Sequence, residues 1–115
     1  MTKYLCVTNL MKYVGLKANM KGYEYVRDII LLLSERDELR HHLTEGVYPI
    51  IADKYKVSVA SVERSIRHSI ERAFDICAPE ILYGVFGNSI DPNKGKATNS
   101  EFLLVLFDLF KIAYK

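Results

Sequence analysis

Apolar side chains recur every three or four residues along most of the chain, and alternating strand-like stretches are nearly absent. This period is typical of amphipathic helices, so we expect an all-α domain, a compact bundle of about six helices. The predicted helices run from Thr2 to Val14, Tyr23 to Leu33, residue 45 to Tyr55, Val59 to Phe74, Pro79 to Phe86 and Thr98 to the C-terminal end, with a short helical piece at 39–43.

Residues that favour helix ends flank these segments. Gly15 follows the first helix, and Thr44 and Ser58 precede the third and fourth helices as predicted N-caps. Thr98 and Glu101 form a Thr-x-x-Glu capping box, which predicts the start of the last helix. The segment 88–97 is rich in Asn, Pro, Gly and Lys and is predicted to be a loop.

A helix-turn-helix is predicted at about residues 45–74. Only Lys56-Val57-Ser58 separates the two helices, and so short a turn sets helices at a steep angle. On the second helix, the spacing i, i+3, i+4, i+7 makes one polar face, which is formed by Arg64, Arg67, His68 and Glu71, with Ser61 and Glu63 beside it.

This polar face carries the side chains that read the major groove of DNA. Arginine can donate two hydrogen bonds to guanine, glutamate can accept one from cytosine, and serine or histidine can contact bases or phosphate. The predicted base-reading residues are Glu63, Arg64, Arg67 and His68, and the predicted phosphate or flanking contacts are Lys54, Lys56, Ser58, Ser61, Arg72, Lys94 and Lys96. The last two precede the amide-rich start of the final helix, a second candidate phosphate site.

A simpler interpretation of the same face is a solvated helix surface with internal charge pairs. Glu63 with Arg67, and Arg64 with Glu71 and His68, have the spacing of such pairs. Because helix-turn-helix geometry also occurs in domains that bind no DNA, the pattern alone leaves both interpretations open.

Composition is compatible with one intracellular domain. The 115 residues, half of them apolar, predict a single domain over 1–115 with its own core. A net charge of +2 favours an anionic partner only weakly. Cys6 and Cys77 are expected to be reduced, and no apolar run approaches the length of a membrane span. We therefore expect a cytoplasmic, nucleoid-associated protein.

Enzymatic and metal chemistry find little support in the sequence. His41 and His42 are adjacent, so their side chains diverge by about 100° on a helix, and no further ligands complete a metal site. Ser65, His68 and Glu71 offer a hydroxyl, an imidazole and a carboxylate, but we expect all three on one exposed helix surface without a pocket. The prediction is a protein that is not an enzyme and has no cofactor or metal.

The last predicted helix has a wide apolar surface, formed by Leu103, Leu104, Leu106, Phe107, Leu109 and Phe110. A single stripe facing the core needs fewer apolar positions than this. We therefore expect part of the surface to contact a partner or a second copy of the chain.

Three strings of residues carry a resemblance to a known family. They are Met20-Lys21-Gly22-Tyr23-x-Tyr25-x-Arg27; Tyr48-Pro49, Ile51-Ala52 and Lys54-Tyr55 followed by Val62-Glu63-Arg64, Ile66-Arg67-His68 and Ile70-Glu71; and Lys96-x-Thr98-Asn99-Ser100-Glu101-Phe102. Together they resemble the C-terminal effector domains of stage zero sporulation protein A, the response regulator that commits spore-forming bacteria to sporulation. The similarity covers nearly the whole chain.

The resemblance implies a six-helix domain whose recognition helix spans about Val59 to Phe74. It also implies binding to short duplex boxes with a TGTCGAA-like core, often as tandem copies, and hence a homodimer on such boxes. By position, the family's base-reading residues fall on Glu63, Arg64, Arg67 and His68.

The chain departs from the family at several places. Ala60-Ser61 stands where the family has Ser-Arg, and Lys56 stands where it tends to have Asn, which tolerates a left-handed conformation better. The segment 75–87, implied to contact an RNA polymerase sigma subunit, is apolar here instead of polar. The 115 residues leave no room for a receiver domain, which is compatible with an excised fragment or a stand-alone relative.

These departures leave a second function open. A protein-interaction module of the same fold would antagonise or titrate other regulators through its apolar last helix and the segment 75–87, without specific DNA binding.

Overall fold

The computed structural model describes residues 1–87, 90 and 95–115. Its α-helices in this part of the chain are α1 (Lys3–Tyr13), α2 (Tyr23–Glu35), α3 (Tyr48–Tyr55), α4 (Val59–Ile76), α5 (Pro79–Phe86) and α6 (Asn99–Ala113), with no strand among the described residues. A 3-10 segment (Asp37–His41) and a π-helical segment (Leu43–Val47) connect α2 to α3. The all-α prediction is confirmed.

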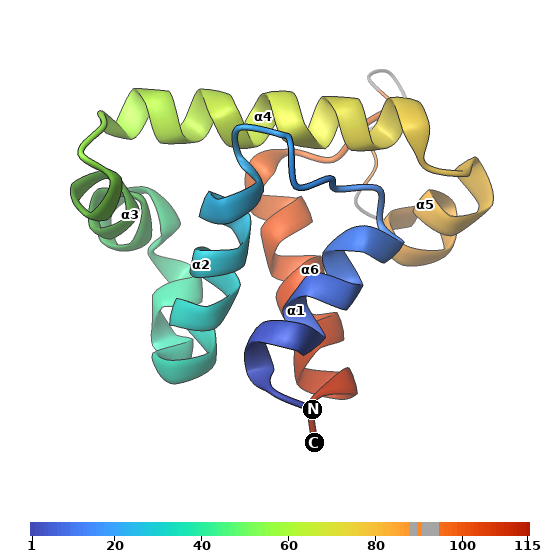
Figure 1. The fold of residues 1–115 in the computed structure, drawn as a ribbon, viewed down its shortest axis with the longest axis horizontal. Helices are drawn as coiled ribbons and strands as arrows, with labels where there is room; N and C mark the ends of the chain where they lie inside the picture. The colour runs from blue at the N-terminus through green and yellow to red at the C-terminus, as the bar shows by residue number, and fades with distance from the viewer. Residues whose placement is uncertain (88–89, 91–94) are drawn as a thin grey trace.

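α4 lies across one side of the domain, and α1, α2 and α6 lie beneath it (Figure 1). Its apolar stripe, Val62, Ile66, Ile70 and Ala73, is almost fully buried in the core. The helix runs two residues beyond the predicted end, to Ile76. Because the core takes up one side of α4, the opposite side is left at the surface.

α6 is the central helix of the bundle, in contact with α1, α2, α4 and α5. Leu103, Leu106, Phe107 and Phe110 are therefore all buried inside the domain. The expectation that its apolar surface exceeds the needs of the core is wrong for these four residues, since a helix with neighbours on several sides buries more than one stripe. None of the helices in the described part of the chain is long and apolar enough to cross a membrane.

Two of the three predicted N-caps form as expected. The Ser58 hydroxyl accepts from the Ser61 N–H at 3.0 Å. Thr98 and Glu101 complete a capping box, with the Glu101 N–H donating to Thr98 Oγ1 at 3.2 Å and the Thr98 N–H donating to Glu101 Oε1 at 3.0 Å. These bonds satisfy N–H groups that a helix start otherwise leaves unpaired.

The prediction that Thr44 caps the third helix is wrong. α3 has Val47 at its N-cap position and no side-chain cap. The preceding π-helical turn already pairs N–H groups at this point, because Gly46 and Val47 both donate to the His42 carbonyl, at 2.8 and 3.1 Å. The chain thus enters α3 from another helical turn, so Thr44 has no free helix start to cap.

Lys56 ends α3 in the left-handed conformation, with φ 57° and ψ 45°. This conformation costs a residue with a Cβ roughly 1–2 kcal/mol. We expect Lys56→Gly to raise the free energy of unfolding by up to about 1 kcal/mol, since glycine also gains freedom in the unfolded chain. Lys56→Asn should give a smaller gain.

Chemical denaturation of the three proteins measures this effect. Ala60→Gly, at an exposed helical position, is the matched control and should lose about 1 kcal/mol. A loss of stability in Lys56→Gly would contradict a strained backbone at this turn.

Candidate nucleic-acid interface

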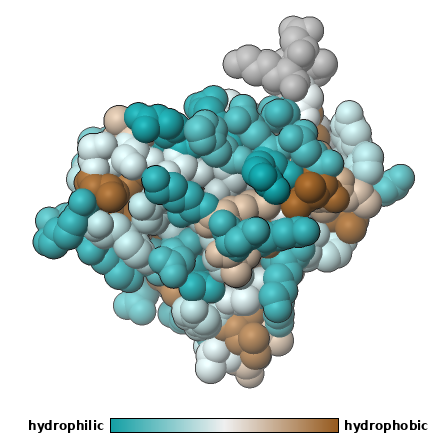
Figure 2. Space-filling model, turned by 45° about the horizontal axis from the view of Figure 1, so that its top comes forward, coloured by the Kyte–Doolittle hydropathy of each residue, from teal (hydrophilic) through white to brown (hydrophobic). Residues whose placement is uncertain are grey.

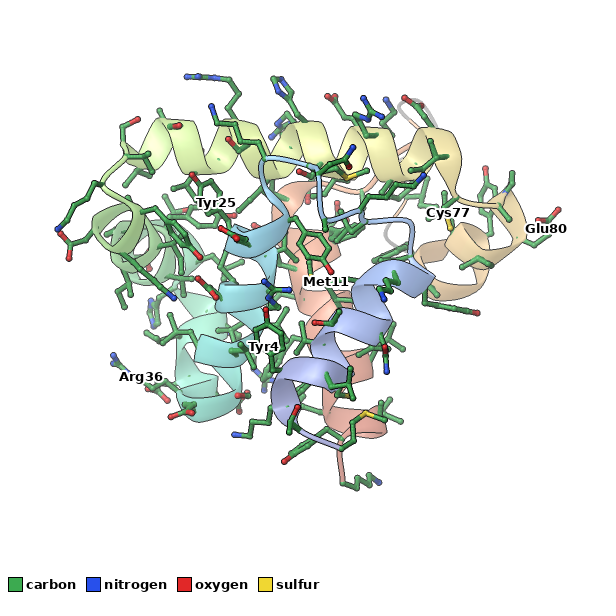
Figure 3. All side chains as sticks on the ribbon, in the orientation of Figure 1. Tyr4, Met11, Tyr25, Arg36, Cys77 and Glu80 are labelled. Carbon is green, nitrogen blue, oxygen red and sulfur yellow. The ribbon has the colours of Figure 1, made fainter. Side chains whose placement is uncertain are left out.

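The exposed side of α4 carries a row of cationic and polar side chains. Arg64, Arg67, His68 and Arg72 are all exposed along the helix. Figure 2 shows mostly hydrophilic residues over this face, and Figure 3 shows nitrogen-tipped side chains projecting from α4 away from the bundle. The helix therefore presents hydrogen-bond donors to solvent along several turns.

These side chains are not paired with one another. Among the residues that the structure describes, no ion pair involves Glu63, Arg64, Arg67, Glu71 or Arg72. The interpretation of this face as a set of internal charge pairs is therefore wrong for the structure. The guanidinium groups of Arg64 and Arg67 keep their donors free for a ligand.

Glu63 occupies a different position from the two arginines. It is half-buried, and its backbone carbonyl accepts from Asn99 Nδ2 at 3.0 Å. Burial raises the pKa of Tyr48 to about 12, and the Glu63 carboxylate contributes to that rise. Glu63 thus lies where α4 meets α3 and the start of α6, at the side of the exposed row.

One flank of α4 is held by the turn between α1 and α2, which passes in front of the helix in Figure 1. The Gly22 N–H donates to Ser69 Oγ at 3.1 Å, and the Ser69 hydroxyl donates to the Ser65 carbonyl at 2.9 Å. Ser65 is buried beneath this turn, so the prediction that it lies exposed with His68 and Glu71 is wrong. The close approach brings Asn19 and Lys21 beside His68 and Arg72.

The other flank of α4 is held by the start of α6. Lys96 and Thr98 line a cavity of about 300 Å³ together with Arg67 and Glu71. The bond from Asn99 to the carbonyl of Glu63 fixes this contact. Lys96 therefore lies beside the exposed row of α4, whereas Lys94 lies outside the described residues.

The remaining predicted contacts lie around the turn between α3 and α4. Lys54 Nζ is 2.9 Å from Asp28 Oδ2 of α2, and the Tyr55 hydroxyl donates to the same oxygen. Burial and this bond to Asp28 raise the pKa of Tyr55 above its ordinary value. Lys56 is exposed, with its Nζ 3.9 Å from Asp53 Oδ1.

Two of the predicted contact residues are serines at the start of α4. Ser58 is exposed and caps α4, and Ser61 is half-buried in the first turn of the helix. Lys54 is therefore directed toward α2, whereas Lys56 and Ser58 are open to solvent at the end of the row.

Sequence reasoning missed three residues that shape this surface: Lys21, Asp28 and Asn99. Lys21 and Asn99 lie inside strings that carry the family resemblance but received no role. The sequence did contain a signal for Lys21, because the next residue is Gly22 and α4 has small serine side chains spaced i, i+4. Small residues on both segments allow the two backbones to approach closely. Asp28 had no comparable signal, since its partners on α3 are 26 and 27 positions away.

The chain was compared with models of protein families. The family model described as "Sporulation initiation factor Spo0A C terminal" matches residues 7–110. The match includes α4, both segments that flank it and most of α6.

Proposed function

The chain belongs to the Spo0A C-terminal family, the DNA-binding effector domain of a sporulation regulator, and on this premise we propose that it reads a TGTCGAA-like box by placing α4 in the major groove. The observation that carries the proposal is the row of exposed, unpaired donors on α4. A helix with its side chains is about 10–12 Å across, which suits a groove about 12 Å wide.

We assign base reading to four residues of α4. Arg64 and Arg67 donate to guanine O6 and N7, and Glu63 accepts from cytosine N4. His68 contacts a base edge or a phosphate. The half-buried position of Glu63 favours contact with one strand only, on the side of α3 and α6.

The phosphate contacts surround this set. We assign them to Lys56, Ser58 and Ser61 at the start of α4, to Arg72 near its end and to Lys96 beside Arg67. Lys54 contacts a phosphate if it gives up its ion pair with Asp28. If the ion pair with Asp28 persists, Lys54 instead orients α3. Residues 1–115 act as one effector domain in this proposal.

Binding to labelled duplexes tests the function directly. Fluorescence anisotropy with a TGTCGAA-containing duplex and with a scrambled duplex of equal length, over about 50–200 mM salt, should give a steep salt dependence for both and a clear preference for the box. Equal affinity for the two duplexes at low salt would reject box reading.

Protein partners are a separate part of the proposal. Ile76 and Tyr83 of the segment 75–87 are exposed, so apolar surface is open to a partner in this segment. This segment is our candidate contact for an RNA polymerase sigma subunit, and tandem boxes would bring two copies of the chain together as a homodimer. The exposed side chains of Ile76 and Tyr83 also favour the second candidate function, an interaction module that titrates other regulators. Loss of box preference in the binding experiment would support this second function.

A further inference from the structure

We propose that the groove between the α1–α2 turn and α4 is a binding site for one DNA backbone phosphate, with Lys21 as its main cation. The inference rests on duplex DNA binding by α4 and adds a contact from a segment outside the helix-turn-helix. It names a residue, Lys21, that box reading does not require.

The groove is built by the tight approach of Gly22 to α4. A Cβ on Gly22 would lie 2.5 Å from the Ser65 carbonyl oxygen and 2.6 Å from Ser69 Oγ, so only glycine fits here. The hydrogen bond from the Gly22 N–H to Ser69 holds the turn in this place. Lys21, the preceding residue, is therefore held at the edge of α4 while its side chain stays exposed.

The walls of the groove carry positive charge and donors without an opposing carboxylate. Its lining residues include Asn19 and Lys21 from the turn and His68 and Arg72 from α4, above the buried Ser65 and Ser69. No Asp or Glu of the described residues lines it. The cavity beside Lys96 differs in this respect, because Glu71 forms part of its wall.

The size of the groove suits a small anionic group. Its volume is about 210 Å³, below the roughly 300–1,000 Å³ of sites that hold small molecules. Its two cations, Lys21 from the turn and Arg72 from α4, are side chains of the kind that contact phosphate oxygens.

The position of the groove matches the path of a DNA strand. A helix in the major groove has one backbone along each of its flanks. Lys96 lies along one flank of α4 beside Arg67, and Lys21 lies along the other beside Arg72. In this arrangement the α1–α2 turn contacts one DNA strand, and the start of α6 lies beside the other.

The salt dependence of binding tests this site. A lysine that neutralises one phosphate contributes about 0.9 to the slope of log affinity against log salt. Lys21→Gln should lower that slope by about one and weaken box and scrambled duplexes by the same factor, whereas Lys21→Arg should keep the slope. Lys111→Gln, near the C-terminal end of α6 and away from α4 (Figure 1), is the matched control and should leave the slope unchanged.

A second measurement locates the phosphate. Duplexes with a single neutral methylphosphonate should reveal one backbone position that weakens binding of the natural protein but not of Lys21→Gln. An unchanged slope in Lys21→Gln, or no such position, would overturn the proposal. Since the slope is measured on any duplex, this outcome is distinct from a failure of box reading.

Discussion

Gly22→Ala is expected to lower the free energy of unfolding by on the order of 2–4 kcal/mol, from about 1–3 kcal/mol of overpacking and about 1 kcal/mol for a lost hydrogen bond. The new methyl group would lie 2.5 Å from the carbonyl oxygen of Ser65, well inside contact distance. That oxygen belongs to the backbone of α4 and cannot turn away as a side chain could. The turn must therefore move off the helix, which also breaks the bond from Gly22 to Ser69.

Equilibrium unfolding in urea, followed by circular dichroism, measures this loss. Gly84→Ala is the matched control, because Gly84 lies inside α5 and a Cβ there meets nothing within 4 Å. That variant should gain roughly 0.5–1 kcal/mol from the better helix propensity of alanine. Equal stability of Gly22→Ala and the natural protein would show that the turn does not pack on α4 in solution.

Arg67→Ala is expected to weaken binding to the TGTCGAA-containing duplex by on the order of 1–3 kcal/mol and to relax the preference for it. Arg67 is exposed on α4 and forms no ion pair among the described residues, so its guanidinium is free to contact a guanine with two donors. Lys in its place keeps the charge but loses the planar pair of donors. Arg67→Lys should therefore lose much of the base preference while it retains the salt dependence.

Anisotropy with box and scrambled duplexes, measured over a series of salt concentrations, separates these effects. Arg36→Ala is the control, since Arg36 lies at the end of α2 far from α4 (Figure 3). Arg67 also lines the cavity that contains Lys96, so a phosphate contact is the competing role. Equal losses on the two duplexes would assign Arg67 to phosphate and refute base reading.

Much of the exposed face of α4 could be predicted from the sequence. The stripe from Val62 to Ala73 repeats at helical spacing, so the opposite side of the same helix had to be exposed. Ser58 and Thr98 correctly predicted the starts of α4 and α6, because a side-chain cap involves residues only three positions apart. The family resemblance singled out Lys56 as standing where the family tends to have Asn, and the residue is left-handed in the structure.

The predictions that are wrong concern neighbours that no local pattern describes. Ser65 has the period of a residue near the exposed side, but the α1–α2 turn covers it. Thr44 has the chemistry of a cap, but a π-helical turn supplies the bonds instead. Of the apolar side chains of α6 that suggested an interface, Leu103, Leu106, Phe107 and Phe110 fill the centre of the bundle, whereas Leu104 and Leu109 are half-buried.

The sequence by itself determined the helices, their caps and the exposed donors of α4, because these depend on period and on bonds between residues a few positions apart. Only the tertiary structure decided what lies along the two flanks of α4. Gly22 meets Ser69 across 47 positions and Asn99 meets Glu63 across 36. Such contacts are set by how the helices pack, so the placement of Lys21 and Lys96 beside the recognition face follows from the fold alone.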